Sequence, residues 1–231
     1  MCVIAVSKKG IAQPDTDTIK RMFENNADGA GYMTARKGRV EISKGFMKLE
    51  DLLCALRYEK FTDADPVVYH FRISTGGNGA PMTHPFPLTN HIANCKLLDL
   101  ACPVGCAHNG IISLTADPKD KEYSDTAHFI SEYLYYLIRN KKDLRNPAIM
   151  DAIKNITKSK WAFMDGTGYI ATCGEFYEDD GILYSNTSYR VNYKRFTYTP
   201  SYTPPTMNYS RSRKVWHDEE FTEADYAALD C

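Results

Sequence analysis

The apolar residues of this chain recur with two different spacings, which predict both strands and helices. Residues 2–6, CVIAV, form a short apolar run that is typical of a buried strand. In residues 15–27 and 48–60 the apolar positions repeat at helical spacing, so each segment is expected to bury one face of a helix. Further strands are expected in this half at 28–32, 38–46 and 66–75.

The second half of the chain continues in the same mixed pattern. Residues 76–87, GGNGAPMTHPFP, are expected to form a loop because of their Gly and Pro content. Residues 91–112 contain one or two strands with a cysteine-rich connection. The spacing predicts helices at 124–140 and 147–157. Residues 160–190 indicate a strand, a turn, a strand, a turn and a strand, with MDGTG and EDDG as the turns.

The order of these elements predicts an α+β fold. It lacks the regular strand–helix–strand alternation that builds a parallel sheet, so antiparallel pairing is expected. Near residue 196 the pattern changes, because residues 197–231 are rich in Pro, Ser, Thr and Tyr and have no sustained period. We therefore expect one domain over residues 1–196 and an extended tail over residues 197–231.

Charge and composition narrow the class of protein. The 231 residues include 28 basic and 29 acidic side chains, so no global field favours nucleic acid or an anionic membrane. No segment reaches the ~18 apolar residues of a membrane span. Lys8 and Lys9 follow the first apolar run, whereas a signal peptide has its basic residues before it. With an odd number of cysteines, 7, these features predict a cytoplasmic protein that binds neither nucleic acid nor membrane.

Several polar residues fall at predicted strand ends and turns, and each has an ordinary structural interpretation. Cys2 can be a small hydrophobe at the start of a strand. Arg72 can be a surface charge, and His84 a loop residue bonded to the backbone. Asn109–Gly110 has the sequence of a type I′ hairpin turn, and Asp125 that of a helix cap.

Taken in order, the segments that contain these residues point to chemistry. They are Met1–Cys2, HFRISTGG (70–77), THPF (83–86), AHNGII (107–112) and SDTAHFI (124–130). This order resembles the glutaminase domain of the class II glutamine amidotransferases, a branch of the N-terminal nucleophile (Ntn) hydrolases. The segment YSNTSYR (184–190) is also similar to small stand-alone, often phage-encoded, members. The resemblance covers about residues 2–190.

The resemblance implies a four-layer αββα sandwich with antiparallel sheets and a site without metal or organic cofactor. Cys2, N-terminal once Met1 is removed by an aminopeptidase or autocatalytically, would attack the side-chain amide of glutamine and form a thioester. Asn109 and Gly110 would form the oxyanion hole. The substrate-binding residues that it implies are Arg72 for the α-carboxylate, Asp125 for the α-ammonium, and Thr75, Gly76 and His84 in the pocket.

The chain departs from the family pattern at three positions. Val3 follows the cysteine where Gly is frequent, Gly76 replaces a pocket histidine, and Ala127 replaces the glutamate of the S-D-T-E motif. These departures bear on the substrate more than on the nucleophile. A second hypothesis is therefore an Ntn amidohydrolase that acts on another amide or a γ-glutamyl compound. A third is a binding protein that has kept the fold, against which Cys2, Asn109 and Gly110 argue.

Two further questions concern partners and metal. An amidotransferase passes ammonia to an acceptor, and the residues after 196 are too few for a synthetase domain, so a separate acceptor or synthetase subunit is expected, in the host cytoplasm if the protein is phage-encoded. Cys95, Cys102 and Cys106 lie near His108, which raises the alternative of a zinc site. Their spacing is not that of a common zinc module, so free thiols are expected instead.

Overall fold

The computed structural model describes residues 2–74, 79–115, 121–190 and 214–215 of the chain. Within these ranges the strands form one eight-stranded and one four-stranded sheet. The strands are β1 (Val3–Ser7), β2 (Ala30–Arg36), β3 (Arg39–Phe46), β4 (Val67–Phe71), β5 (Phe86–Pro87), β6 (Asp99–Cys102), β7 (Val104–Asn109), β8 (Lys160–Asp165), β9 (Ile170–Cys173), β10 (Tyr177–Asp179), β11 (Ile182–Tyr184) and β12 (Lys214–Val215). The helices are α1 (Thr16–Asn25), α2 (Leu49–Glu59), α3 (Asp125–Phe129), α4 (Tyr135–Leu137) and α5 (Pro147–Thr157), with a π-helix at Ile130–Leu134 and 3₁₀ turns at Ala80–Met82, Ile92–Lys96, Ser113–Thr115 and Lys141–Arg145.

The larger sheet places the N-terminal strand in its interior. Its order is β10-β11-β1-β4-β2-β3-β6-β12, and the described pairings are antiparallel except for β12 beside β6. Strand β1 pairs with β4 so that Val3 lies opposite Phe71, and with β11 so that Ala5 lies opposite Tyr184. The residue before β1 is therefore held between the ends of two neighbouring strands.

The smaller sheet has the order β5-β7-β8-β9, and its pairings are antiparallel. The chain passes from the larger sheet to the smaller one between β6 and β7, at Pro103. Proline has no N–H to donate to a ladder, so it suits the point at which pairing changes sheets. Asn109, the last residue of β7, pairs with Lys160 at the start of β8.

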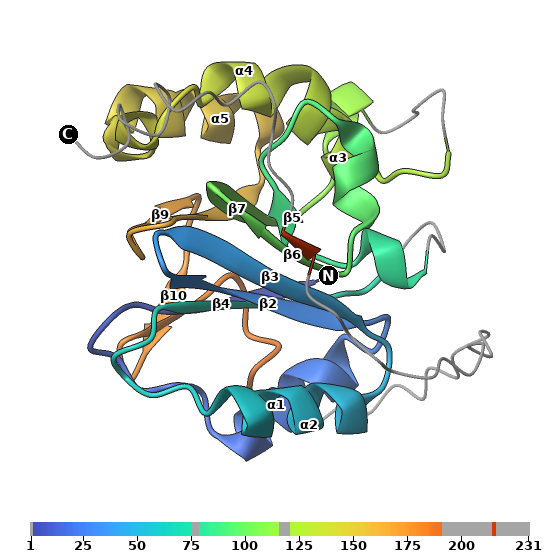
Figure 1. The fold of residues 1–231 in the computed structure, drawn as a ribbon, viewed down its shortest axis with the longest axis vertical. Coiled ribbons are helices and arrows are strands. Elements are labelled where there is room, and N and C mark those ends of the chain that lie inside the picture. The colour runs from blue at the N-terminus through green and yellow to red at the C-terminus, as the bar shows by residue number, and fades with distance from the viewer. Residues whose placement is uncertain (1, 75–78, 116–120, 191–213, 216–231) are drawn as a thin grey trace.

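The two sheets face each other, and helices cover their outer faces. Figure 1 shows α1 and α2 on one side, the sheets in the middle, and α3, α4 and α5 on the other side. Strand β1 is buried on both faces: Ile4 and Val6 pack between the sheets, while Val3 and Ala5 pack toward α1 and α2. This double burial explains why β1 is a continuous apolar run without alternating polar positions.

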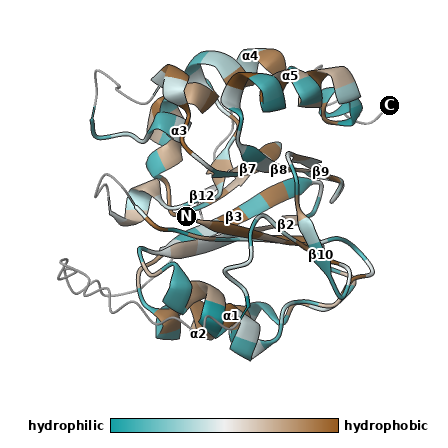
Figure 2. Ribbon diagram, turned by 180° about the vertical axis from the view of Figure 1, so that it is seen from behind, coloured by the Kyte–Doolittle hydropathy of each residue, from teal (hydrophilic) through white to brown (hydrophobic). Residues whose placement is uncertain are grey.

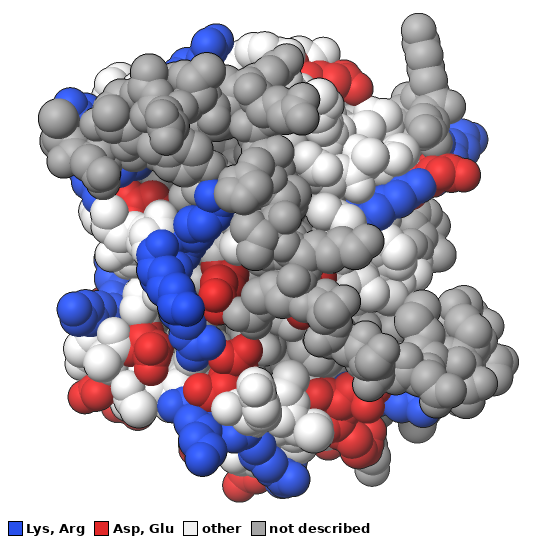
Figure 3. All heavy atoms as spheres, in the orientation of Figure 1, with Lys and Arg blue, Asp and Glu red and all other residues white. Residues whose placement is uncertain are grey.

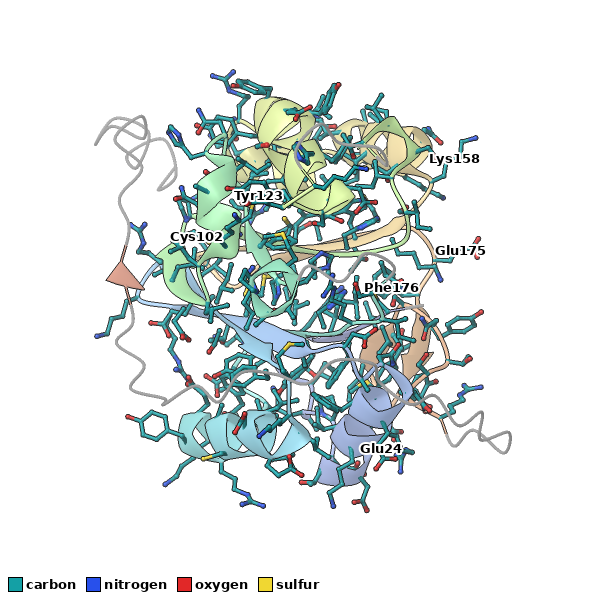
Figure 4. All side chains as sticks on the ribbon, turned by 90° about the vertical axis from the view of Figure 1, so that its right-hand side faces the viewer. Glu24, Cys102, Tyr123, Lys158, Glu175 and Phe176 are labelled. Carbon is teal, nitrogen blue, oxygen red and sulfur yellow. The ribbon has the colours of Figure 1, made fainter. Side chains whose placement is uncertain are left out.

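Hydropathy follows the same layers. The middle strands in Figure 2 carry mostly hydrophobic residues, whereas the helices carry both kinds. Cys102 and Phe176 lie toward the two ends of the layer between the sheets (Figure 4). On the face that Figure 3 shows, Lys and Arg are interspersed with Asp and Glu, without a region of one sign. No described helix is long and apolar enough to cross a membrane.

The α+β class and the antiparallel sheets predicted from the sequence are confirmed, but several predicted boundaries are wrong. The strand expected at 66–75 ends at Phe71, and Arg72 is the first residue after it. The stretch 160–190 contains four strands, because Gly174 (φ +85°) allows a further turn between β9 and β10. The helix expected at 124–140 ends at Leu137 and contains a π-helical turn. The proposed boundary at residue 196 lies outside the described residues.

Candidate functional site

Cys2 lies directly before β1, beside the chain that leaves β4. The Ile73 N–H donates to Cys2 Sγ over 3.4 Å, and the thiol is 3.4 Å from the Ile73 carbonyl oxygen. Burial raises the pKa of the Cys2 thiol, because a thiolate is poorly solvated there. The Ile73 N–H and the nearby Arg72 charge lower this pKa and partly oppose the effect of burial. The sulfur therefore sits where a positive neighbour can help to stabilise its charged form.

Arg72 is held beside Cys2 by its backbone. Its N–H donates to the Gly29 carbonyl over 2.8 Å, and its carbonyl accepts from the Asp28 N–H over 3.0 Å. The side chain is only 9% exposed, and Nη1 donates to the Gly79 carbonyl over 3.4 Å. Burial lowers the pKa of Arg72, while the charges of Cys2, Asp28 and Asp125 raise it. The buried Arg72 guanidinium therefore interacts electrostatically with the Cys2 sulfur and with the carboxylates of Asp28 and Asp125.

Asp28 is a site residue without a role among the motif residues. Its Oδ2 accepts from the Ser74 N–H over 2.7 Å, which fixes the segment that follows Arg72. Gly29 next to it has φ +112°, and a Cβ there would lie 2.7 Å from Thr83 Cγ2. The Asp-Gly pair at 28–29 was the available signal. Its function is to anchor the two strand ends beside Cys2.

Asn109 and Gly110 stand at the end of β7, in the other sheet. The Asn109 side chain is 7% exposed, and its Nδ2 donates to Ser185 Oγ over 2.8 Å. Gly110 has φ +155°, and a Cβ there would lie 2.3 Å from Ser159 Oγ. The hairpin-turn interpretation of this pair is wrong, because the chain continues into the 3₁₀ turn Ser113–Thr115. The glycine is required by space as well as by backbone conformation.

The loop after β11 joins Asn109 to β1, the strand that follows Cys2. Ser185 Oγ accepts from the Ile4 N–H over 2.8 Å, and the Ser185 N–H donates to the Ile4 carbonyl over 2.9 Å. Asn186 Nδ2 donates to the Cys2 carbonyl over 2.6 Å. Both residues belong to the segment YSNTSYR. Its similarity to other sequences was noted in the sequence, but no role was expected for any of its residues. One loop therefore fixes the backbone of Cys2 and the side chain of Asn109.

Asp125 begins α3 but does not cap it. The cap is Ser124, whose hydroxyl accepts from the Ala127 N–H over 3.2 Å, so the interpretation of Asp125 as the cap is wrong. Asp125 Oδ2 accepts instead from the Ile112 N–H over 2.8 Å, and Oδ1 from the Thr126 N–H over 2.7 Å. The carboxylate thereby fixes the loop after Gly110 and remains in electrostatic contact with Arg72.

His84 lies in a buried histidine cluster with His70 and His108. His70 Nε2 and His84 Nδ1 are each 3.0 Å from the His108 carbonyl oxygen and 3.0 Å from each other. Burial lowers the pKa of His70 and His108 to about 3 and that of His84 well below its ordinary value. All three rings are therefore neutral near pH 7. The contacts of His84 place it behind Asn109, where it supports the backbone; its pocket role stays a prediction.

Hydrogen bonds hold His108 at its backbone and at its ring. Its N–H lies 3.4 Å from His84 Nδ1, and its carbonyl oxygen lies 3.0 Å from both His70 Nε2 and His84 Nδ1, so the tautomers of these two rings decide which nitrogen donates. His108 Nδ1 is 2.9 Å from Thr126 Oγ1. Among the described residues, the buried ring nitrogens His70 Nδ1 and His108 Nε2 have no hydrogen-bond partner. The residue before Asn109 is thus fixed at its N–H, its carbonyl and its ring.

The remaining predicted residues fall into two groups. Thr75 and Gly76 lie outside the described residues. Cys95, Cys102 and Cys106 are free and buried, and burial raises the pKa of each thiol, that of Cys95 to about 12. Within the described ranges, His, Cys, Asp and Glu side chains form no group of three or more that could hold a metal ion.

Comparison with known proteins gives no match: no family model matches the chain, and neither does any curated protein. The interpretation of the site therefore depends on its own geometry and on the sequence motifs.

Proposed function

We propose that this protein is an Ntn hydrolase of the class II glutamine amidotransferase type. The fold of helices, two facing antiparallel sheets and helices supports this proposal (Figure 1). After removal of Met1, Cys2 Sγ attacks the side-chain carbonyl carbon of glutamine. The carbon–nitrogen bond breaks, ammonia leaves, and water hydrolyses the resulting thioester to glutamate and the free thiol. Ammonia then passes to an acceptor on a separate subunit.

The observation that carries the proposal is the convergence of three distant segments. Cys2 at the start of β1, Arg72 after β4 and Asn109 at the end of β7 come from different strands and both sheets. Arg72 interacts electrostatically with Cys2, while Asn109 connects through Ser185 to the strand that Cys2 begins. A nucleophile, a cation and an amide donor are the parts that hydrolysis of an amino-acid amide requires.

Removal of Met1 would supply the base. The new α-amine of Cys2 has an ordinary pKa of about 7.7–8.0, close to the ~8.5 of a free thiol. It takes the thiol proton during the attack and then gives that proton to the leaving nitrogen, so that ammonia can depart as a neutral molecule. Its positive form also lowers the pKa of the adjacent thiol, in the same direction as Arg72.

Recognition of the amino-acid head group would use the two signs of charge at the site. The Arg72 guanidinium pairs with the α-carboxylate, since its planar fork matches a planar anion. Asp125 is close enough to raise the pKa of that guanidinium by its charge, and it is our choice for the α-ammonium. The backbone N–H of Gly110 and the side chain of Asn109 stabilise the oxyanion. No step requires a metal or an organic cofactor.

A specific observation supports a second candidate, hydrolysis of another amide. Ile73 and Ile111 follow Arg72 and Gly110 directly, and they are 40% and 65% exposed. Exposed apolar side chains next to Arg72 and Gly110 suit a substrate whose amide carries an apolar group. An acylated amine or a γ-glutamyl compound would meet this description, and its hydrolysis would transfer no ammonia.

Ammonia release from glutamine tests the proposal. The protein without Met1 is compared with Cys2→Ala and with Cys54→Ala, which removes an exposed thiol on α2. We expect wild type and Cys54→Ala to release ammonia at the same rate and Cys2→Ala to release none. Ammonia release that survives Cys2→Ala would falsify the assignment. Hydrolysis of a different amide, without glutamine turnover, would favour the second candidate.

A further inference from the structure

The hydroxyl of Ser185 is bonded to residues of both sheets. Its hydroxyl oxygen is 2.8 Å from the Ile4 nitrogen on β1 and 2.8 Å from Asn109 Nδ2 at the end of β7. The side chain is fully buried. Both bonds reach the oxygen from donors, so its two lone pairs are occupied by the nucleophile strand and by the Asn109 amide.

The bond to Ser185 uses one of the two N–H donors of the Asn109 side-chain amide and leaves the other for a substrate. A side-chain amide has two N–H donors, and Ser185 accepts one of them. The second N–H is then directed by the fixed amide plane. Without Ser185 the amide could rotate or exchange its oxygen and nitrogen, since the two ends differ little in shape. An oxyanion donor is effective only when it is held in place before the charge develops.

The backbone around Ser185 makes this constraint rigid. The Ser185 N–H donates to the Ile4 carbonyl, and its own carbonyl accepts from Lys160 Nζ at the start of β8. The neighbouring Asn186 holds the Cys2 carbonyl. Ser185 is therefore fixed to β1 and β8 independently of Asn109, and any movement of Asn109 relative to Cys2 must break one of these bonds.

We propose that Ser185 is a positioning residue that sets the Asn109 amide against the Cys2 strand, so that one N–H of Asn109 points at the oxyanion. This inference rests on the proposed function, and it assigns a role to a residue of the YSNTSYR segment, for which the resemblance implied none. Ser185 touches neither the substrate nor the reacting atoms and acts through Asn109.

Kinetics of five variants test this role: Ser185→Ala, Ser185→Thr, Asn109→Ala, the double variant Asn109→Ala with Ser185→Ala, and Ser7→Ala. Ser185→Ala should lower kcat by roughly 10- to 100-fold, less than the loss of a whole oxyanion donor, with KM changed by less than about twofold. Ser185→Thr keeps the hydroxyl and should restore most of kcat. In an Asn109→Ala background, Ser185→Ala should have almost no further effect on kcat, because its only route is gone. Ser7→Ala removes another buried serine at the far end of β1 and should leave kcat unchanged.

The outcomes separate this role from a structural one and from the proposed function. Removal of Ser185 leaves the Ile4 N–H without a partner, so some loss of thermal stability is expected in either case. Alkylation of Cys2 by iodoacetamide, which needs no oxyanion hole, should keep its rate in Ser185→Ala. Equal kcat in wild type and Ser185→Ala, or a loss that persists in full in the Asn109→Ala background, overturns the role of Ser185 alone. A wild type that releases no ammonia overturns the proposed function, and this role with it.

Discussion

His84 Nδ1 lies 3.0 Å from His70 Nε2, and both nitrogens lie 3.0 Å from the carbonyl oxygen of His108. One ring hydrogen is thus shared between an imidazole and the backbone directly before Asn109. The arrangement works only while the rings are neutral, because a second proton would place two N–H groups against each other. Protonation of this cluster therefore opposes folding.

The first prediction concerns stability in acid. His70 and His108 have folded pKa values of about 3 against an ordinary 6.5, so between these values the unfolded chain binds more protons. Their stabilising effect is fully present above pH 6.5 and is lost as the pH falls toward 3. Each contributes a slope of up to ~1.4 kcal/mol per pH unit. When the free energy of unfolding is measured with urea at pH 7.5, 6 and 5, it should fall less steeply with decreasing pH for His70→Gln than for wild type. Equal slopes of this free energy against pH would contradict the lowered pKa of His70.

The second prediction concerns Lys44, a buried cation. Its Nζ donates to the carbonyls of Pro81 and Cys95 and lies 3.9 Å from the Phe86 ring centroid. Burial lowers its pKa from 10.5 to about 7. Between pH 7 and 10.5 Lys44 therefore binds more protons in the unfolded chain, so the contribution of Lys44 to stability is greatest above pH 10.5 and falls as the pH is lowered to 7.

Lys44→Met removes this titration. The free energy of unfolding of wild type, measured by urea at pH 7, 8.5 and 10, should rise relative to that of Lys44→Met as the pH increases. The difference can change by up to ~1.4 kcal/mol per pH unit. A difference that stays constant over this range would show that Lys44 remains charged in the fold.

The third prediction concerns Gly110. Ala at this position meets both a positive φ, +155°, and Ser159 Oγ at 2.3 Å. Gly10 also has a positive φ, +89°, but a Cβ there would have nothing within 4 Å, so Gly10→Ala is the matched control. Gly110→Ala should lower stability by about 1–3 kcal/mol more than Gly10→Ala, which is the usual cost of overpacking. Equal losses in the two variants would mean that the close contact with Ser159 can relax.

The fourth prediction concerns Arg72. Arg72→Lys keeps a positive charge but loses the planar fork, so pairing with a substrate carboxylate weakens. We expect kcat/KM for glutamine to fall about 10- to 100-fold, mainly through KM, by the loss of a charge-assisted hydrogen bond. The exposed Arg57→Lys on α2 is the control and should not change the kinetics. An unchanged KM in Arg72→Lys would remove Arg72 from substrate recognition.

Local patterns predicted most of the elements but little of the connection between the sheets. The helix expected at 147–157 is present as α5, and β1 has the burial that its apolar run indicates. The position of Arg72 after β4 depends on backbone bonds to Asp28 and Gly29, which lie just before β2 and far from Arg72 in the sequence. Periodicity reports local burial and cannot show such a contact.

The candidate site shows the same division. Cys2, Arg72, Asn109 and Asp125 could be chosen from the sequence, because the order of the segments that contain them resembles a known family. Ser185 and Asn186 lie more than a hundred positions from Cys2 along the chain, in a segment with no chemical signature, and only the sheet topology brings them there. His84 could be chosen as a residue but not oriented, since its contacts with His70 and His108 depend on packing between the sheets.

The most direct test of the central claim is the site of labelling by diazo-oxo-norleucine, a glutamine analogue that reacts with an N-terminal cysteine nucleophile. It needs no acceptor subunit, so it examines Cys2 alone. Intact mass and peptide mapping should show one adduct per chain, on Cys2, in chains without Met1 and not in chains that keep it. Competition with glutamine should slow the labelling. An adduct on another cysteine, or equal labelling with Met1 retained, would contradict the account.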